Sequence, residues 1–274
     1  MKSNWFAVET VQLQLMRLPT VFSGIRVAQI SDIHMGGWMN ADRLQDIASC
    51  VVALTPDLLL ITGDFLIGRG FREISKQWIN DLRKVLSPLA ALIPSFGVLG
   101  NHDYWTNPHA IREMLSQSGI TDLTNTVFTL SREGENLHLC GVDDVRAGNV
   151  RLDLVLAQLK DDSPAILLAH EPDFADISAA TGKFDLQVSG HTHGGQIVIP
   201  YLGTPILPRL GRKYPSGLYR VGKMFQYTNR GLGVNRFALR WNCPPEVTVF
   251  TLQSVDSEIL ALPQASTSLV DLPK

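Results

Sequence analysis

Cysteine is scarce in this chain of 274 residues, and the cysteines present do not form pairs. Cys50, Cys140 and Cys243 are odd in number and far apart, and no CxxC motif occurs. This spacing excludes a framework of several disulfides and argues against a zinc site built from thiolates. It is compatible with a reducing compartment, so we expect a cytoplasmic protein.

Long apolar runs and an excess of charge of one sign are missing as well. Near the N-terminus the apolar residues are interrupted by Glu9, Thr10, Gln12 and Gln14, so we expect neither a signal peptide nor a membrane-spanning helix. The net charge is −2, so no overall attraction to nucleic acid or acidic lipid is expected. With 45% hydrophobic and 18% charged residues, the chain has enough apolar side chains for a folded core.

The motifs of several common enzyme classes do not occur either. There is no GxSxG, no GxGxxG and no GxxxxGK[ST]. These absences remove the usual sequence signals of a serine nucleophile elbow, a dinucleotide site and a P-loop.

The chain does contain short apolar runs that alternate with segments of helical periodicity. We expect strands at residues 8–15, 24–32, 56–64, 94–103, 136–144, 164–172 and 184–193. Helices are expected at residues 41–54, 74–86, 107–119, 152–159 and 174–181. Three further strands, at 217–222, 224–229 and 246–252, have no helices between them. This order predicts a layered α/β or α+β domain with mixed sheets.

We expect one domain that spans residues 1–274. Its motif-bearing core would cover residues 26–195, and a C-terminal β-rich completion would cover residues 196–252. The tail at residues 263–274, in a segment rich in Ser, Thr and Pro, is expected to fray.

Polar side chains gather where the predicted strands end. The segments SDIHMG, TGDF, GNHD, LAHE and GHTH each follow an apolar run, and their candidate residues are Asp32, His34, Asp64, Asn101, His102, Asp103, His170, His191 and His193. Because ligands gather at the carboxyl ends of strands in open α/β sheets, we expect these side chains to meet at one rim.

This mixture of carboxylate, amide and imidazole groups suits divalent manganese, iron, zinc, cobalt or nickel. The set is large enough for two metal ions if both share Asp64. His191 and His193 are two residues apart and would point the same way in an extended segment, so each can serve a different metal of a close pair. We expect the neighbouring glycines to leave room for metals and substrate.

The order Asp-x-His, Gly-Asp, Gly-Asn-His-Asp, His and Gly-His-Thr-His resembles the calcineurin-like metallophosphoesterase superfamily over residues 26–195. The stretches GHTHGGQIVIP and YTNRGLGVNRFALRWNCPPEVTVFTL are similar to the bacterial YkuE/YaeI-type branch and extend the resemblance to about residue 252. The resemblance implies two facing mixed β-sheets flanked by helices. It also implies a dinuclear metal-dependent phosphoesterase that hydrolyses a phosphodiester or pyrophosphate bond with a metal-bridging hydroxide.

The resemblance implies a role for each motif residue. Four residues would hold the first metal: Asp32, His34, Asp64 and His193. Four would hold the second: Asp64, Asn101, His170 and His191. Asp64 would bridge the two ions, which we expect to be manganese, iron, zinc or cobalt. His102 would not be a ligand; it would face the leaving group as a general acid or as a transition-state stabiliser.

Other polar residues are interpreted as structural. Asp103 is expected to support the ligands from behind or to begin a helix. His109, His138, Asn229 and Arg230 are expected to make structural contacts. Arg69 follows Asp64 by five positions, whereas the phosphate-binding arginine of related phosphatases follows by four, so the motif is broken.

The segment after the metal motifs leaves the substrate open. Arg209, Arg212 and Lys213 are interpreted first as part of a solvated loop, and alternatively as a cationic clamp for a second substrate phosphate. The stretch VIPYLGTPILP (198–208) is either the edge of the core or an apolar lip that meets a lipid or the membrane surface.

We therefore expect a small phosphorylated substrate, with a nucleotide-linked lipid as one candidate. The specific alternative is a UDP-diacylglucosamine pyrophosphatase of lipid A synthesis, located peripherally on the inner membrane face. A nuclease is less favoured because the chain lacks a basic groove signature. A non-catalytic metal-binding scaffold would require missing ligands, and the sequence contains the full set.

Overall fold

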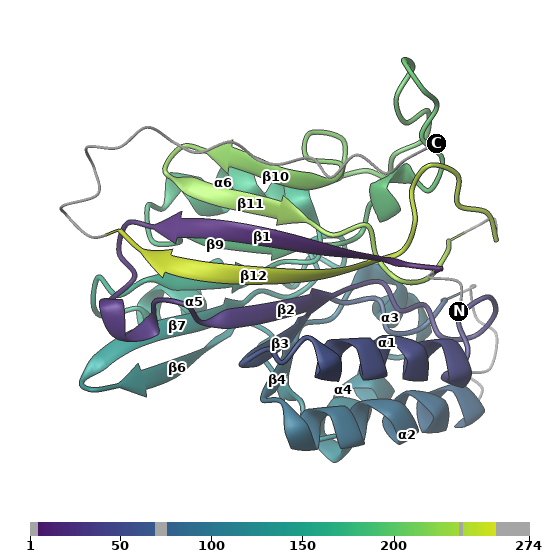
Figure 1. Ribbon diagram of the computed structural model, residues 1–274, viewed down its shortest axis with the longest axis horizontal. Coiled ribbons are helices and arrows are strands. Elements are labelled where there is room, and N and C mark those ends of the chain that lie inside the picture. Colours follow the sequence, from purple (N-terminus) through teal and green to yellow (C-terminus); the bar gives the residue numbers. More distant parts are fainter. Residues whose placement is uncertain (1–4, 69–75, 236–237, 256–274) are drawn as a thin grey trace.

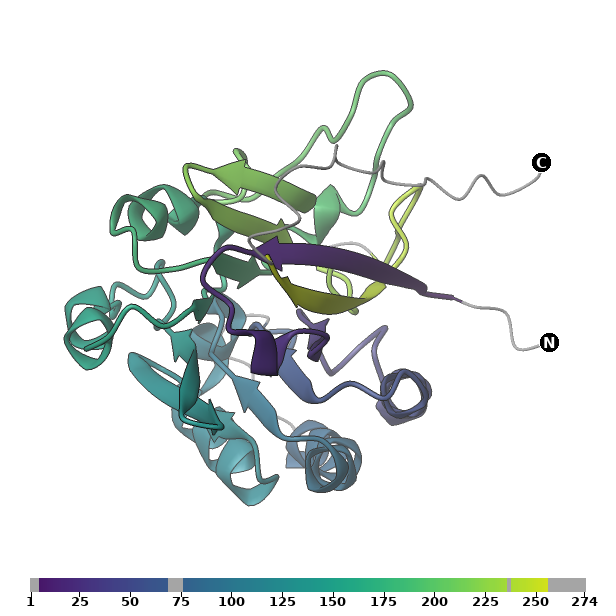
Figure 2. The same ribbon diagram turned by 60° about the vertical axis from the view of Figure 1, so that its left-hand side comes forward.

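A computed structural model describes residues 5–68, 76–235 and 238–255 of the chain. Two six-stranded mixed sheets face each other, and helices cover their outer faces (Figures 1 and 2). The predicted fold class is therefore confirmed. Arg69 and the predicted tail at residues 263–274 lie outside the described residues.

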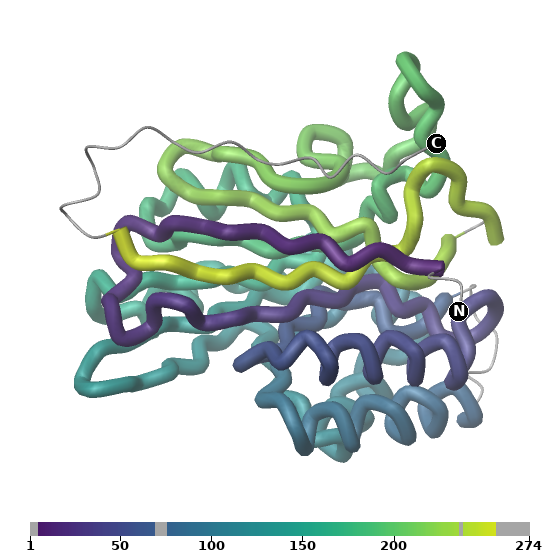
Figure 3. Tube along the Cα trace, viewed as in Figure 1, coloured from purple at the N-terminus to yellow at the C-terminus, as the bar shows by residue number. Residues whose placement is uncertain are grey.

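The first sheet combines both ends of the described chain. Its strands, in spatial order, are β1 (Ala7–Leu15), β12 (Glu246–Ser254), β2 (Arg26–Ile30), β3 (Leu58–Ile61), β4 (Ser95–Gly97) and β5 (Thr121–Asp122). β1 runs parallel to β12, with Ala7 opposite Glu246, and Figure 3 shows the two lying side by side. β12 is antiparallel to β2, whereas β2, β3, β4 and β5 are parallel.

The second sheet has a similar arrangement. Its strands, in spatial order, are β10 (Gly217–Val221), β11 (Met224–Thr228), β9 (Leu186–Ser189), β8 (Ala165–Leu168), β7 (Glu135–Gly141) and β6 (Thr126–Arg132). The four central strands are parallel, and the two edge strands are antiparallel to their neighbours. Each sheet thus has a parallel centre whose strands end at a common edge.

The helices lie in two groups. Those packed on the first sheet are α1 (Ala41–Ala53), α2 (Lys76–Leu92) and α4 (Pro108–Gln117). Those packed on the second are α5 (Leu152–Gln158) and α6 (Ala175–Ala180). The short helix α3 (Asn101–Thr106) begins just beyond β4. None of the helices in the described parts of the chain is long and apolar enough to cross a membrane.

Burial on both faces explains the uninterrupted apolar runs of the central strands. In β3, Leu58 and Leu60 belong to the core between the sheets, whereas Leu59 and Ile61 belong to the core under the helices. Successive side chains of a strand point to opposite faces, so a strand covered on both sides needs apolar residues at every position. β1, at the sheet edge, instead alternates between more and less buried positions, as the sequence VETVQLQL predicts.

Several predicted boundaries were wrong. The strand expected at 94–103 ends at Gly97, and Asn101 already belongs to helix α3. Helix α2 continues past Pro88 to Leu92 because Leu89 is buried in the core. Strand β6 was not expected, since few of its side chains are buried and its sequence lacks an apolar alternation.

Candidate metal centre

The predicted ligand residues meet where the two sheets face each other. Asp32 and His34 follow β2, Asp64 follows β3, and Asn101 follows β4 in the first sheet. His170 follows β8, and His191 and His193 follow β9 in the second sheet. All seven side chains are buried. Parallel strands thus deliver donors from both sheets to one place, as expected for carboxyl ends.

One group of side chains consists of Asp32, His34 and His193. The Nε2 atoms of His34 and His193 are 3.0 Å apart. Oδ1 of Asp32 lies 3.3 Å from Nε2 of His193 and 3.8 Å from Nε2 of His34. Three donor atoms this close, with two imidazole nitrogens facing each other, are arranged as they would be around a cation.

A second group consists of Asp64, His170 and His191. Nε2 of His170 is 3.2 Å from Oδ2 of Asp64 and 3.2 Å from Nδ1 of His191. Hydrogen bonds orient both rings: the Nδ1 of His170 is 2.7 Å from the carbonyl of Thr62, and the Nε2 of His191 is 2.9 Å from that of Arg209. A proton on each of these nitrogens leaves the other nitrogen of the ring free to bind a metal.

Asp64 connects the two groups. Its Oδ1 accepts a hydrogen bond of 2.8 Å from the backbone N–H of His102. Its Oδ2 lies 3.5 Å from Nε2 of His34 and 3.2 Å from Nε2 of His170. One oxygen therefore faces a histidine of each group. The overlapping His/Asp triads are consistent with a dimetal site.

The side chain of Asn101 supports the same interpretation. Its Oδ1 and Nδ2 are buried and have no hydrogen-bond partner among the described residues. Leaving a buried amide without a hydrogen-bond partner lowers the stability of the fold by about 1–3 kcal/mol. We therefore expect this side chain to bind a group that the chain itself does not supply. An amide oxygen beside these carboxylates and imidazoles fits a hard or borderline divalent cation.

Backbone geometry marks the same residues. Asp32, His34, Asp64, His191 and His193 all have positive φ values, between 48° and 70°. This region is uncommon for residues other than glycine, and each such residue costs of order 1–3 kcal/mol that the surrounding structure must offset. Five of the twelve positive-φ residues other than glycine in the described parts of the chain are thus candidate ligands, and backbone strain that clusters in this way is typical of a functional site.

The segment that carries His191 and His193 is not extended, which contradicts our expectation. Thr192 has helical φ and ψ values, and a 3-10 turn follows at His193–Gly195. The two rings therefore separate because the backbone turns, and each joins a different group. Gly190 makes room for the side chains of Ser31 and Asp32, with which a Cβ would collide, and not for metals or substrate as expected.

The charges of the site favour ionised carboxylates. Burial alone would raise the pKa of Asp32 and Asp64, but neighbouring histidines outweigh it and lower both values. Burial lowers the pKa of His191 to about 3 and that of His193 well below its ordinary value. Neutral imidazoles and charged carboxylates are the forms that bind metals. His170 differs: despite burial, Asp64 raises its pKa well above the ordinary value, so a metal would compete with that proton.

His102 lies at the border between the metal groups and an adjacent cavity. Its ring centroid is 4.5 Å from that of His34 and 4.6 Å from that of Trp105. Its Nδ1 is buried and without a partner among the described residues. Burial lowers the pKa of His102 to about 4, so the ring is neutral near pH 7 and offers one N–H. His102 also lies close to two candidate ligands: one donor atom of His102, one of His34 and one of Asp64 are all within 4.8 Å of one another.

Asp103 supports the site from behind and caps helix α3, as expected. Its Oδ2 accepts hydrogen bonds from the backbone N–H groups of Asp64 and Gly100, at 2.9 and 3.0 Å. Its Oδ1 accepts from Phe65 and Leu66, at 2.9 and 3.3 Å. This carboxylate therefore ties the loop after β3 to the start of α3.

Three of the four residues interpreted as structural, His138, Asn229 and Arg230, have structural partners. His138 lies 2.9 Å from Thr129 Oγ1 and 2.9 Å from Asp161 Oδ1, and His109 lies exposed on α4. Asn229 donates to Thr248 at 2.8 Å, and Arg230 pairs with buried Glu246 at 2.6 Å.

Arg240 was not singled out from the sequence, yet it lies directly behind His193. Its Nη2 is 3.2 Å from Nδ1 of His193 and donates to the carbonyls of Arg230, Gly231 and Gly233 at 2.6–3.0 Å. Arginine nitrogens only donate, so Nδ1 of His193 accepts from Nη2 only when the proton of the ring lies on Nε2; with a metal on Nε2 the 3.2 Å contact is not a hydrogen bond. No local sequence signal predicts this contact, because it arises from tertiary packing of the loop before β12.

A cavity of about 390 Å³ opens onto the metal groups. Its lining includes the candidate ligands Asn101, His191 and His193, together with His102. Trp105, Arg146 and Arg209 line it as well, with an apolar stretch that includes residues 205–208. None of the described residues that line this cavity is acidic. The cavity is therefore suited to an anionic substrate.

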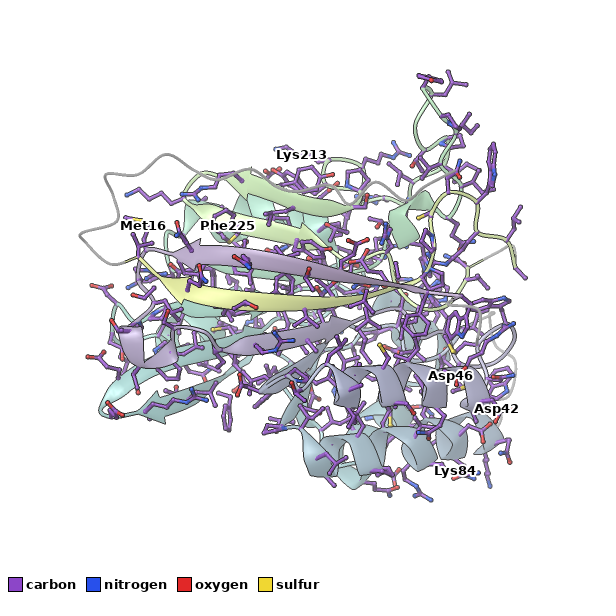
Figure 4. All side chains as sticks on the ribbon, viewed as in Figure 1. Met16, Asp42, Asp46, Lys84, Lys213 and Phe225 are labelled. Atoms are coloured by element: carbon purple, nitrogen blue, oxygen red, sulfur yellow. The ribbon has the colours of Figure 1, made fainter. Side chains whose placement is uncertain are left out.

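The structure separates the three basic residues of the loop. Arg209 lines the cavity, whereas Arg212 and Lys213 do not. The ammonium group of Lys213 pairs with Asp176 of α6 at 2.6 Å, and Figure 4 labels Lys213 near β10. Trp105 and Arg146, which line the cavity, were not recognised in the sequence because neither belongs to a metal motif.

Comparison with known proteins agrees with this geometry. Residues 25–195 match the family described as calcineurin-like phosphoesterase. The chain belongs to this family. It is thus a phosphoesterase of the hydrolase class, as the order of its motifs predicts.

Two bacterial proteins are similar over most of the chain. The metallophosphoesterase YkuE of Bacillus subtilis (strain 168) is 35% identical over 241 residues, which cover 87% of this chain and 82% of YkuE. The phosphodiesterase YaeI of Escherichia coli (strain K12) is 31% identical over 252 residues, which cover 91% and 89% of the two chains.

Solved structures support the fold. A dimetal phosphatase from Danio rerio superposes with a TM-score of 0.52 at 12% identity, covering 76% of this chain and 88% of that one. A 5'-nucleotidase from Staphylococcus aureus, described as putative, gives a TM-score of 0.50 at 14% identity, covering 86% of this chain and 55% of that chain. At these identities the likeness concerns the calcineurin-like fold alone.

Proposed function

We propose that the protein is a dinuclear metal-dependent phosphoesterase that hydrolyses a phosphodiester or pyrophosphate bond. The observation that carries this proposal is the position of Asp64 Oδ2, which faces His34 of one group at 3.5 Å and His170 of the other at 3.2 Å. A carboxylate oxygen shared in this way suits two cations about 3.5–4 Å apart, the spacing of two-metal phosphoesterase sites. The similarity to the phosphodiesterase YaeI supports the same reaction class.

The proposed ligand sets follow the two groups of side chains. Asp32, His34, Asp64 and His193 hold the first metal, and Asp64, Asn101, His170 and His191 hold the second. When bound, the metals supply charge that stabilises a phosphoryl group during its transfer to water. The unpartnered amide of Asn101 supports the second set, as do Nε2 of His170 and Nδ1 of His191, which face each other at 3.2 Å.

His102 assists departure of the leaving group. It borders both the metal groups and the cavity, and its backbone N–H holds Asp64 in place. Its ring is neutral near pH 7, so it offers a single N–H toward the departing oxygen. It thereby stabilises the negative charge that develops on this oxygen, by donating a hydrogen bond and not by giving up its proton.

A metal-reconstituted activity screen tests this proposal. The protein is first treated with a chelator to remove bound metal and is then loaded with manganese, iron, zinc or cobalt. It is then assayed with bis-p-nitrophenyl phosphate, p-nitrophenyl phosphate, cyclic nucleotides and UDP-diacylglucosamine. We expect hydrolysis of at least one diester or pyrophosphate that depends on added metal. Turnover that is unchanged in Asp64→Asn would contradict the proposal, because this variant alters the shared ligand.

A lipid-linked pyrophosphate, such as UDP-diacylglucosamine, is a second candidate substrate. The supporting observation is the segment 198–208, which projects from the body of the molecule in Figures 1 and 2. Tyr201, Leu202 and Ile206 are exposed on it, and Ile206 also lines the cavity. Exposed apolar side chains at the mouth of a site can contact acyl chains or a peripheral membrane surface.

The variant Leu202→Ser separates this candidate from the general proposal. Leu202 is 81% exposed and does not line the cavity. If acyl chains contact the segment, the KM for UDP-diacylglucosamine rises while the turnover of bis-p-nitrophenyl phosphate stays as in the wild type. An unchanged KM for the lipid-linked substrate counts against the lipid candidate and leaves the phosphoesterase proposal intact.

A further inference from the structure

The cavity beside the metal centre carries two arginines that no metal motif includes. Arg146 lies in the loop after β7, and Arg209 lies in the loop between β9 and β10. Both side chains are exposed, and neither is paired with a carboxylate among the described residues. Arg17, Arg112, Arg151 and Arg230 have acidic partners, whereas other described arginines such as Arg43 and Arg212 do not. Arg146 and Arg209 differ from those in lining the cavity. Two unpaired guanidinium groups beside one cavity are available to bind a ligand.

Each arginine is connected to the metal groups by contacts. The carbonyl of Arg209 is 2.9 Å from Nε2 of His191, so the backbone of Arg209 is fixed beside the second group. The guanidinium of Arg146 lies 5.0 Å from the ring centroid of Trp105, and this ring is 4.6 Å from that of His102. The cation–π contact holds a flexible arginine over one aromatic face. Trp105 is thus a positioning residue for Arg146.

The charge balance of the cavity restricts what these arginines bind. In the proposed function, a phosphoryl group undergoing hydrolysis would lie beside the cavity residues Asn101, His102, His191 and His193. Arg146 and Arg209 line the same cavity without being candidate metal ligands, and none of the described lining residues is acidic. A substrate with a single phosphate would leave the two guanidinium groups to solvent. A second phosphoryl group, attached to the first, would meet them.

We propose that Arg146 and Arg209 form a clamp for a second phosphoryl group, so that the preferred substrates are diphosphates flanked by organic groups. This inference rests on the proposed function and specifies its substrate class. Guanidinium groups bind phosphate oxygens through pairs of parallel N–H bonds, which gives both attraction and orientation. Arg212 and Lys213 are not part of the clamp.

Calorimetric titration of the metal-loaded protein tests the clamp without relying on catalysis. The probes are methylenediphosphonate and methylphosphonate, which lack a hydrolysable P–O–P or ester bond. Both are titrated with metal in excess, and a protein-free blank corrects for chelation. We expect the wild type to bind the diphosphonate at least tenfold more tightly than the monophosphonate. Equal affinity for the two probes would overturn the proposal.

Substitutions show which residues cause the preference for the diphosphonate over the monophosphonate. In Arg146→Gln and Arg209→Gln the ratio of the two dissociation constants should fall roughly tenfold, which corresponds to about 1.4 kcal/mol. Arg212→Gln is the matched control, because it removes an exposed arginine of the same loop that does not line the cavity, and it should keep the wild-type ratio. Trp105→Leu should lower the ratio by releasing Arg146, whereas Trp105→Phe should preserve it. The clamp is wrong if Arg212→Gln lowers the ratio as much as Arg146→Gln does.

Hydrolysis of bis-p-nitrophenyl phosphate by the wild-type preparation separates failure of the clamp from failure of the proposed function. If the wild type hydrolyses this diester but binds both probes equally, the clamp alone is wrong. If it prefers the diphosphonate through Arg146 and Arg209 but hydrolyses no phosphoester, the clamp stands and the proposed reaction is wrong.

Discussion

The position of one carboxylate oxygen decides how the candidate metal centre is interpreted. Oδ1 of Asp64 is held by the N–H of His102, which leaves Oδ2 between His34 and His170. If Oδ2 binds two cations, its negative charge lowers their mutual repulsion. Asp64→Asn keeps the size of the side chain but removes this charge. We expect loss of metal and of activity, measured as metal content per chain and as turnover of bis-p-nitrophenyl phosphate.

Asp162→Asn is a suitable control for that experiment. The side chain of Asp162 is 91% exposed and forms an ion pair with Lys183. The same chemical change there should alter neither metal content nor turnover, because an exposed ion pair contributes little. Retention of two metals and near-normal turnover in Asp64→Asn would show that the ligand assignment is wrong.

His102 makes a different prediction, because it borders the metal groups without belonging to either proposed ligand set. His102→Ala should keep both metals but lower the turnover of substrates with poor leaving groups by about 10²–10⁴. Substrates with activated leaving groups, such as p-nitrophenolate, should lose less. The measurement compares kcat for a series of aryl diesters of rising leaving-group pKa. An equal loss across the series would contradict the proposed role.

The motif residues could be predicted individually, whereas their neighbours could not. Asp32, His34 and Asp64 are recognisable because each stands at a fixed offset from a buried strand. Trp105 and Arg146 lie outside such motifs, and their contact depends on how the loop after β7 folds toward α3. Positive φ values at ligand residues are likewise not readable from the sequence, because Asp and His adopt such values more often than most residues but still only occasionally.

At the scale of elements, Arg230 connects the two strands that close the first sheet. It pairs with Glu9 of β1 and with buried Glu246 of β12, at 2.6 Å in both cases. Arg230→Met should leave the carboxylate of Glu246 buried without its charged partner. We expect the free energy of unfolding to fall by about 3–5 kcal/mol, measured by chemical denaturation.

Glu9→Gln provides the matched comparison on the same arginine. The side chain of Glu9 is 43% exposed, whereas that of Glu246 is 2% exposed. Removing the exposed charge should cost about 0–1 kcal/mol. If both variants lose the same stability, burial of Glu246 is not what makes the pair important.

Elements were predictable where burial imposes a pattern. The central strands are covered on both faces, and their apolar runs identify them. β6 lies at a sheet edge with mostly exposed side chains, so its sequence carries no such pattern. The strand predicted at 94–103 was too long for another reason. β4 ends at Gly97, but the next residues, Val98 and Leu99, are buried although they are not in a strand. Buried apolar residues therefore extended the apparent strand into helix α3.

At the scale of the whole molecule, the candidate ligands come from two layers. The first sheet contributes four, Asp32, His34, Asp64 and Asn101, and the second contributes three, His170, His191 and His193. The sheets are otherwise joined by an apolar core that contains Leu60, Phe96, Ile166, Val188 and Phe250. Bound metals would add links between the same two layers at their polar rim.

Metal removal should therefore destabilise the fold and not merely stop catalysis. The folded chain presents donors from both sheets at distances of 3.0–3.8 Å, whereas the unfolded chain spreads them over residues 32–193. A ligand that binds only the folded state stabilises it by about 2.7 kcal/mol at a hundredfold excess over its Kd. The positive φ values at five donors oppose folding, and metal binding offsets part of that cost. We expect the Tm of the metal-loaded wild type to fall after treatment with EDTA and to recover when metal is restored. In Asp64→Asn the same treatment should change Tm much less, because that variant retains metal weakly. An EDTA-treated wild type that has lost its metal yet unfolds at an unchanged temperature would show that the two sheets do not depend on the metal centre.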